Sequence, residues 1–436
     1  MKTKFWDVPD YILFTSVFIL IILGIAFIYS SGINSQGILV TNEYIKQIIW
    51  ALLGIVLMIL SSLYDYSKFE RYAQNLYIGL LIVLLYTCLF GRYVNGARSW
   101  LGIGDFGIQP SEFGKIIFII FLAHYLSETK NENQLRRFIT AIAFFILPIG
   151  LILIQPDLGT ASVYIPIFLV MCFMAGIPIR YVIFILGIGT CTIFLTILPV
   201  WNNVIAKKSF AVIGALTIPK LRLLLIITSL LITIIGIIGL RYLHGKKYFY
   251  WISYFFLIMT ISFIFSFAAG NVLKDYQIKR LIVYMDPAID PLGSGWNIIQ
   301  SKIAIGSGGI FGRTFLHGTQ SHYRFLPQQS TDFIFSILSE ELGFAGGLFV
   351  FILYAIIFQR TIKIIRNSSS RFGCYIASGI LAMFAFHFFI NVGMVMGIMP
   401  ITGIPLLFLS YGGSSLWTAM ICIGMLMSIN YRKYNK

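Results

Sequence analysis

The run YILFTSVFILIILGIAFIYSS, residues 11–31, decides the fold class because it is uncharged and almost wholly apolar. A helix that spans a bilayer needs about 20 consecutive apolar residues. The run is longer than the core of a signal peptide and has no small-x-small cleavage pattern. We therefore interpret it as an uncleaved first transmembrane helix.

Similar runs recur along the chain of 436 residues, which is 58% hydrophobic, only 11% charged and has a mean hydropathy of +0.88. These values lie far outside the range of soluble domains. Lipid offers no partner to an open backbone, so the runs are predicted to be helices. We predict one all-α polytopic membrane domain over residues 1–436, with about 12 transmembrane helices. They are expected near 11–30, 46–63, 74–91, 111–127, 137–154, 158–177, 181–200, 221–240, 248–269, 343–360, 372–394 and 404–430.

The net charge of +16 comes from basic residues that lie in short clusters between the apolar runs. That arrangement is typical of cytoplasmic loops and argues against nucleic-acid binding. The positive-inside rule predicts that both termini are cytoplasmic and that the 270–342 loop lies outside. Four basic residues disagree, because they fall in an expected outer loop: Lys207, Lys208, Lys220 and Arg222.

The longest polar interval of the chain runs from Asp286 to Phe344. Loops on a rigid scaffold carry function disproportionately, so we expect residues 270–342 to form an extracytoplasmic catalytic loop. Its glycine-rich part, residues 306–309, does not follow a strand and lacks the Lys-Ser/Thr of a P-loop. It therefore does not indicate nucleotide binding.

Ionisable residues from four separate places converge on the expected outer side of the membrane. Glu112 and Lys115 open the fourth predicted helix, and they share one of its faces because they are three residues apart. Asp157 links the fifth and sixth predicted helices, Arg98 precedes the fourth, and Asp332 follows the long loop. Ionisable groups at a membrane edge are costly and mark functional sites.

Each of these residues also has a purely structural interpretation. Glu112 and Lys115 could neutralise each other inside the bundle. Asp157 and Asp332 could each cap the helix that follows. Arg98 could extend its side chain to the membrane interface.

The sequence has no pattern typical of a structural zinc site, because it lacks His-x-x-x-His and paired-Cys spacings. His124 and His387 lie within predicted helices, and we interpret them as satisfied bundle residues. The five cysteines lie within or beside apolar runs, which favours core packing over disulfides.

A series of motifs follows the chain in order: Gln-Pro-Ser-Glu at 109–112 with Lys115, Gln-Pro-Asp-Leu-Gly-Thr at 155–160, Gln-Ser-x-x-Ala-Ile-Gly-Ser-Gly-Gly at 300–309, Gly-Thr-Gln-Ser at 318–321, Thr-Asp-Phe-Ile-Phe at 331–335, Glu-Glu-Leu-Gly-Phe at 340–344 and Ser-Tyr-Gly-Gly-Ser-Ser at 410–415. Together these motifs resemble the SEDS family (shape, elongation, division and sporulation). The element at 318–321 is similar to that of the elongation member and differs from that of the division member.

The resemblance implies a peptidoglycan glycosyltransferase of cell elongation. Such an enzyme polymerises lipid II into β-1,4 glycan strands at the outer face of the bacterial cytoplasmic (inner) membrane and releases undecaprenyl pyrophosphate. The implied partners are a class B penicillin-binding protein and other membrane proteins of the elongation complex. By its motif, Asp332 takes the position of the family's essential acid and is our candidate general base. Glu112 and Lys115 take the cavity positions beside it.

Negative charge develops on the leaving pyrophosphate, so a divalent cation, Mg²⁺ or Mn²⁺, held by carboxylates is a candidate cofactor. No organic cofactor is expected. The candidate substrate-binding residues are Arg98, Trp100, Gln109, Ser111, Asp157, Gln300, Ser301 and Thr331.

The chain departs from the family pattern in two places. Gln328 stands where the family commonly has Glu, so we assign it no catalytic role. Residues 221–269 look like a helix pair inserted into the usual ten-helix core. The alternative function is a lipid II flippase or another membrane transporter. The acids gather at one face and no halved repeat is evident, which favours the polymerase.

Overall fold

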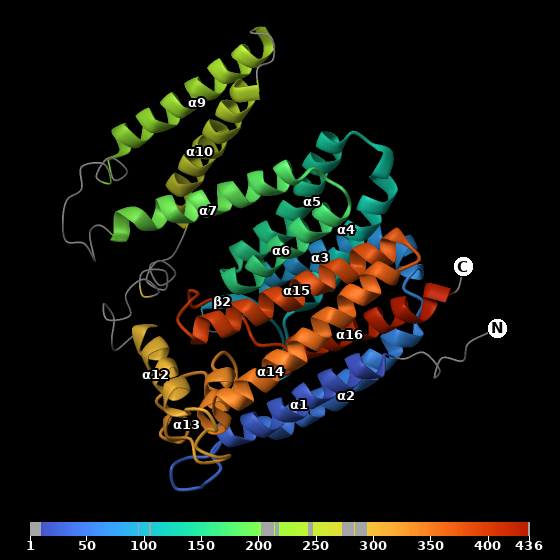
Figure 1. The fold of residues 1–436 in the computed structure, drawn as a ribbon, viewed down its shortest axis with the longest axis vertical. Coiled ribbons are helices and arrows are strands. Elements are labelled where there is room, and N and C mark those ends of the chain that lie inside the picture. The colour runs from blue at the N-terminus through green and yellow to red at the C-terminus, as the bar shows by residue number, and fades with distance from the viewer. Residues whose placement is uncertain are drawn as a thin grey trace. The chain divides into compact units, whose positions relative to one another are not determined.

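The computed structural model describes residues 10–94, 96–103, 106–201, 213, 218–242, 247–272, 283 and 294–434. Over these residues the chain is helical apart from one small sheet and the connecting loops (Figure 1). It divides into two compact units, Met1–Ile177 with Asn297–Lys436, and Pro178–Trp296. Residues 286–293 of the polar interval, and Lys207 with Lys208, lie outside the described residues.

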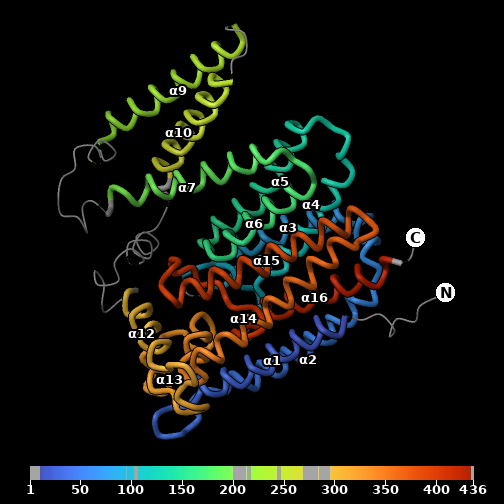
Figure 2. The backbone as a smooth tube through the Cα atoms, in the orientation of Figure 1, coloured from blue at the N-terminus to red at the C-terminus, as the bar shows by residue number. Residues whose placement is uncertain are grey.

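The first unit contains long helices and two short ones, α12 and α13. They are α1 (Tyr11–Ser31), α2 (Glu43–Leu63), α3 (Lys68–Phe90), α4 (Pro110–Glu128), α5 (Gln134–Ile154), α6 (Leu158–Met174), α12 (Ser294–Ser307, in this unit from Asn297), α13 (Thr319–His322), α14 (Ile334–Asn367), α15 (Arg371–Val395) and α16 (Gly413–Tyr431). In this bundle α2 packs along α16 and α1 along α14, while α15 contacts α14, α4 and α6 (Figure 2).

The second unit contains α7 (Ile179–Trp201), α9 (Pro219–Tyr242) and α10 (Lys247–Val272). α9 and α10 approach closely because small residues line their contact: a Cβ added to Gly236 would lie 2.3 Å from Ser253 Oγ. Thr260 Oγ1 also donates a buried hydrogen bond of 3.0 Å to Ser229 Oγ. Small and hydroxyl residues of this kind are typical of helix contacts within membranes. The interpretation of residues 221–269 as an insertion stays a prediction.

The all-helical membrane class is confirmed. Among the described residues, 10 helices are long and apolar enough to cross a membrane, and α6 is a shorter apolar helix. Each predicted segment contains one helix, but α4, which carries Glu112 and Lys115, is not among those 10. The prediction of about 12 spanning helices therefore stays a prediction.

α14 is interrupted at Gly343, whose backbone angles (φ 66°, ψ −161°) are not helical. Only glycine adopts such angles without strain. The helical part Ile334–Leu342 therefore precedes the break, and the longer part follows it. The predicted span near 343–360 begins at this break, whereas the shorter part before it was not predicted.

The predicted helix near 404–430 is wrong in its first part, because α16 begins only at Gly413. Residues 402–412, which we call the central segment, are not helical. Gly403 and Phe408 have φ angles of +70° and +69°, and Pro405 lies between them. These positive φ angles are incompatible with a right-handed helix, although Leu406 to Leu409 are buried as a helix core would be.

Side chains from other helices satisfy the backbone of the central segment. Tyr354 of α14 donates its hydroxyl proton to Leu407 O. Gln47 of α2 donates to Ser410 O (3.3 Å) and accepts from Gly412 N (3.2 Å). Non-helical backbone at membrane depth is tolerated only where protein buries and satisfies it. The central segment meets that condition.

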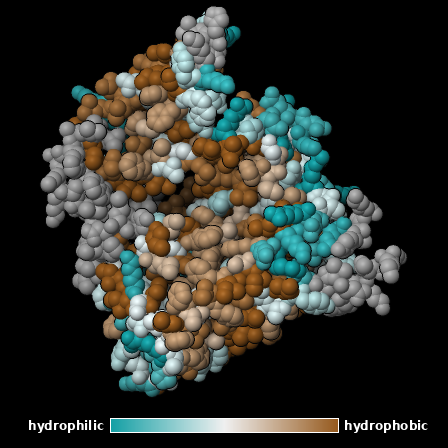
Figure 3. All heavy atoms as spheres, in the orientation of Figure 1, coloured by the Kyte–Doolittle hydropathy of each residue, from teal (hydrophilic) through white to brown (hydrophobic). Residues whose placement is uncertain are grey.

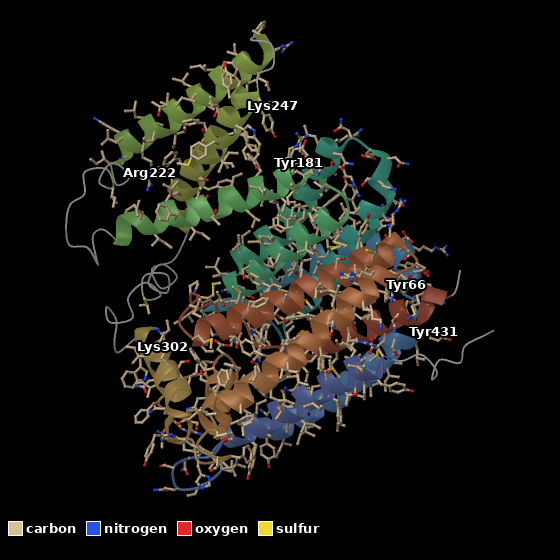
Figure 4. The ribbon with its side chains drawn as sticks, in the orientation of Figure 1. Tyr66, Tyr181, Arg222, Lys247, Lys302 and Tyr431 are labelled. Carbon is tan, nitrogen blue, oxygen red and sulfur yellow. The ribbon has the colours of Figure 1, made fainter. Side chains whose placement is uncertain are left out.

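The first unit has two distinct ends. Figure 4 shows Tyr66 and Tyr431 at one end and Lys302 of α12 at the opposite end. At the first end Tyr66 is hydrogen bonded to Ser370 over 2.9 Å, and Arg360 pairs with Asp10 at 2.7 Å. Between the ends, exposed apolar residues such as those of α2 cover the flank, and hydrophilic ones gather at the ends (Figure 3). Such a surface is typical of a helix bundle in lipid.

Candidate active site

Glu112 and Lys115 form an ion pair within the bundle, as their shared helix face predicts. The two charged atoms are 2.8 Å apart, and the side chains are 5% and 0% exposed. Pro110 occupies the first turn of α4, where its missing N–H costs nothing, and Glu112 follows in the same turn. The pair is therefore buried at the start of α4.

His387 of α15 is the second partner of Lys115, whose Nζ lies 3.2 Å from His387 Nε2. A lysine ammonium only donates hydrogen bonds, so Nε2 must accept. His387 Nδ1 then carries the proton and donates it to Pro405 O over 2.9 Å. The bonding assigns a neutral imidazole that joins Lys115 to the central segment. The interpretation of His387 as a satisfied bundle residue is confirmed.

Asn391 lies one turn further along the same face of α15. Its side-chain Nδ2 donates to Asp332 O (2.9 Å) and to Ile404 O (2.8 Å). The side chain thus holds two separate chain segments together. One helix face therefore contacts Lys115, the central segment and the main chain of Asp332.

Asp332 lies in a tight turn before α14 and is half-buried. Its backbone N–H donates to Gln328 O over 3.2 Å, and Thr331 and Phe333 donate to the same oxygen. Phe333 is the residue that caps α14, so Asp332 is not the cap. A Cβ on the exposed Gly403 would lie 3.6 Å from Asp332 Oδ2. The carboxylate therefore lies beside an open stretch of backbone.

Gln109 and Asp157 are brought together at the same end of the bundle. Gln109 Nε2 donates to Asp157 Oδ2 over 2.7 Å. Asp157 also accepts the backbone N–H of Thr160 at 3.1 Å and caps α6, as its structural interpretation predicted. Gln109 N donates to Ser414 Oγ over 3.1 Å at the start of α16. A role in substrate binding stays a prediction for both residues.

Arg98 and Trp100 lie on a small antiparallel sheet that the sequence analysis did not predict. The strands are β1 (Arg92–Val94), β2 (Ala97–Ile103) and β3 (Phe106–Ile108), in the order β1-β2-β3. Arg98 is exposed, and Trp100 covers Gly107, where a Cβ would lie 2.9 Å from the indole ring. Within the part of the chain that the structure describes, the Lys115 ammonium bonds to Glu112 and His387 and not to Arg98.

The remaining candidate residues are placed as follows. Ser301 donates to Val395 O over 2.7 Å, so Ser336, also at 2.7 Å, must be the donor to Ser301. Gln300 and Ser111 are buried, and the hydroxyl oxygen of Ser111 has no hydrogen-bond partner among the described residues. Thr331 donates to Gln328. These contacts fix α12 and the Asp332 turn in the bundle.

Glu340 and Glu341 anchor residues 316–320 of the polar interval to α14, a role that the sequence analysis did not assign. Glu340 is fully buried and accepts backbone N–H groups from Thr319 (2.7 Å) and Gln320 (2.8 Å). Glu341 accepts Leu316 N at 3.0 Å and the hydroxyl proton of Ser30. The sequence signal that could have indicated this role is the pair of adjacent acids beside an apolar run. A carboxylate buried there requires several hydrogen-bond donors from other parts of the chain.

An open groove of about 600 Å³ lies on the other face of α4. Pro110, Phe113 and Ile117 recur at helical spacing and line it, whereas Glu112 and Lys115 point to the opposite face. The groove is apolar almost throughout, and α3 contributes Leu76, Gly79 and Val83 to it.

Within the described residues, no group of three or more His, Cys, Asp or Glu side chains gathers that could hold a metal ion. A divalent cation, Mg²⁺ or Mn²⁺, therefore stays a prediction, and we derive no step from one. All five cysteines are free.

The fold and the site define a multi-pass membrane protein with a buried ion pair and a half-buried acid, joined through one face of α15. The FtsW/RodA/SpoVE family model, described as cell cycle protein, matches residues 10–210 and 201–435. Peptidoglycan glycosyltransferase RodA of Treponema pallidum (strain Nichols) is 53% identical over 97% of this chain and 98% of its own length. Peptidoglycan glycosyltransferase MrdB of Escherichia coli (strain K12) is 31% identical over 98% and 96%.

A solved chain from a peptidoglycan synthase complex has the same fold, with a TM-score of 0.66 and 24% identity over 98% of this chain and 99% of that one. The sequence matches extend over nearly the whole chain. The protein belongs to the FtsW/RodA/SpoVE family.

Proposed function

We propose that the protein is a peptidoglycan glycosyltransferase that polymerises lipid II into β-1,4 glycan strands during cell elongation. Family membership and the names of the relatives support this activity. The observation that carries the proposal is the position of Asp332. Its carboxylate lies beside exposed backbone at Gly403, and its main-chain carbonyl accepts from Asn391, on the helix face that contacts Lys115.

The reaction needs one general base. The 4-hydroxyl of the acceptor sugar attacks the anomeric carbon of the donor, the bond from that carbon to the pyrophosphate breaks, and the configuration inverts. Asp332 takes the hydroxyl proton as the new glycosidic bond forms. The exposed Arg98 is suited to contact the leaving pyrophosphate directly. Lys115 is fully buried and acts through its charge.

The orientation follows from the positive-inside rule. The basic residues Lys68 and Arg71 follow Tyr66 closely in the chain. The end of the first unit where Figure 4 shows Tyr66 and Tyr431 is therefore proposed to face the cytoplasm. Asp332 then faces the outer side of the cytoplasmic membrane. The fold shared with a chain of a peptidoglycan synthase complex supports a class B penicillin-binding protein as partner.

The apolar groove between α3 and α4 is proposed to hold the polyprenyl tail of the substrate. A tail of this kind must stay in an apolar environment while the sugar head reaches Asp332. Pro110 and Phe113 line the groove from the first turns of α4, the helix that carries Glu112 and Lys115 on its opposite face.

Gly79→Phe is expected to raise the KM for lipid II roughly tenfold with little change in kcat, because it removes apolar contact with the tail. Gly79 lines the groove, and a Cβ there would meet no described atom within 4 Å, so the ring fills the groove without a clash at its base. The measurement is initial-rate polymerisation of labelled lipid II. Gly150→Phe in α5 is the matched control, because its Cβ is equally free. Equal KM values in the two variants would contradict the tail site.

The alternative function is transport. Helices broken within the membrane, such as α14 at Gly343, also occur in transporters. A gel assay with labelled lipid II decides between the two, using the purified protein with and without its penicillin-binding partner. Glycan strands from the wild type support the polymerase. If no strands form even with the partner, and lipid II crosses vesicle membranes that contain the protein, the transporter is correct.

A further inference from the structure

His387 and Asn391 lie one turn apart on a buried face of α15, far in sequence from every candidate catalytic residue. Residues one turn apart point to the same side of a helix, roughly 5.4 Å from each other along the axis. His387 contacts Lys115 and Pro405, whereas Asn391 contacts Ile404 and Asp332. Each side chain donates one hydrogen bond to the central segment, and the two accepting carbonyls, Pro405 O and Ile404 O, are adjacent.

We propose that His387 and Asn391 are positioning residues of the glycosyltransferase, which fix Asp332 and the exposed Gly403 relative to the Lys115 charge. The proposal rests on the proposed function, since it concerns the geometry of that reaction. Neither side chain is assigned contact with the substrate, because they are 1% and 0% exposed.

The hydrogen bonds of Asn391 explain why an amide stands at this position. Two carbonyls from separate segments, Asp332 O and Ile404 O, both accept from Nδ2. A neutral side chain with two donors on one atom is required, and aspartate or leucine cannot supply them. The buried Asn391 Oδ1 has no partner among the described residues. An unpaired buried acceptor is unfavourable, so the residue is used for its donors and not for packing.

The contacts of His387 likewise determine its charge and its tautomer. An imidazolium would place a second cation 3.2 Å from the Lys115 ammonium, which is strongly unfavourable in a buried site. Only the neutral ring with its proton on Nδ1 satisfies both Lys115 and Pro405 O. A glutamine has one acceptor and one donor group at a similar reach, so it can reproduce both bonds. Leucine reproduces neither.

A shift of Asp332 by about 1 Å alters the proton transfer more than the binding of the substrate. Misplacing a catalytic group by about 1 Å lowers the rate by a factor on the order of 10². For His387→Leu and Asn391→Leu we therefore expect kcat to fall by about that factor while the KM for lipid II changes less than about threefold. His387→Gln is expected to recover most of the lost kcat.

The full-length variants are purified, checked for folding by size exclusion and thermal unfolding, and assayed with labelled lipid II. Ser378→Ala is the matched control, because Ser378 is buried in α15 but donates only within its own helix, to Cys374 O. A folded leucine variant with wild-type kcat overturns the proposal. So does a folded His387→Gln that is no more active than His387→Leu. If leucine at 391 prevents folding, Asn391→Ser decides: it must lower kcat more than KM rises.

Hydrogen–deuterium exchange of the peptide 326–333 tests the positioning without any activity. Loss of the Asn391 bond is expected to speed exchange in this peptide roughly fivefold in Asn391→Leu or Asn391→Ser, and not in Ser378→Ala. Unchanged exchange overturns the proposal. If the wild type makes no glycan strands while the Asn391 variants still show the faster exchange, the proposed function is contradicted and the positioning role is correct.

Discussion

Asp332→Ala is expected to abolish glycan strand formation while the protein still folds and inserts. The variant removes the carboxylate that takes the acceptor proton, and loss of a general base lowers rates by a factor on the order of 10² to 10⁴. Folding should survive, because alanine keeps both main-chain hydrogen bonds of this residue: its N–H donates to Gln328 and its carbonyl accepts from Asn391. The measurement is a gel assay of strands from labelled lipid II, in the presence of the penicillin-binding partner.

Two controls sharpen this test. Asp332→Asn keeps the size and polarity of the side chain and removes only its basicity, so it should be as inactive as the alanine variant. Glu132→Ala removes an exposed acid between α4 and α5 and should leave activity unchanged. Unimpaired polymerisation by Asp332→Ala would exclude Asp332 as the base. Activity in Asp332→Asn alone would assign the side chain a hydrogen-bonding role instead.

The helices were predictable from the sequence because each apolar run must satisfy its own backbone in lipid. The same criterion failed at the central segment, where Ile404 to Leu409 are as apolar as a spanning helix. There the backbone is satisfied by Gln47 and Tyr354 from remote helices, which no local pattern reveals. The only hint in the sequence was the set of helix-disfavouring residues Gly403, Pro405 and Gly412. The short strands around Trp100 were missed because they lie within a glycine-rich loop.

The site was predictable where its residues are close in sequence. The spacing of Glu112 and Lys115 predicted a shared face, and their ion pair confirms it. Asp157 was correctly given a capping interpretation, because an acid before an apolar run is a common helix start. The bond between Lys115 and His387 joins positions 272 residues apart. A single sequence holds no information that would bring them together, so the relation of Lys115 to the central segment required the structure.

Lys115→Met is expected to destabilise the protein by about 3 to 5 kcal/mol, because it leaves the Glu112 carboxylate buried without its counter-charge. Glu112→Gln should destabilise less, since His387 still accepts from Lys115. The double variant buries no charge at this pair. The stability that the double variant loses should therefore be smaller than the summed losses of the two single variants, by roughly 3 kcal/mol. Unfolding titrations in mixed micelles measure this coupling.

Polymerisation by the same variants distinguishes a structural pair from a catalytic one. If the Lys115 charge acts on the developing pyrophosphate, the double variant regains stability but stays inactive, because the missing charge is not replaced. If the pair only neutralises itself inside the bundle, activity returns together with stability. Additive losses of stability would show that Glu112 and Lys115 do not act as a pair. The split between recovered stability and lost activity is the result we expect, because Lys115 is linked through His387 and the central segment to the backbone beside Asp332.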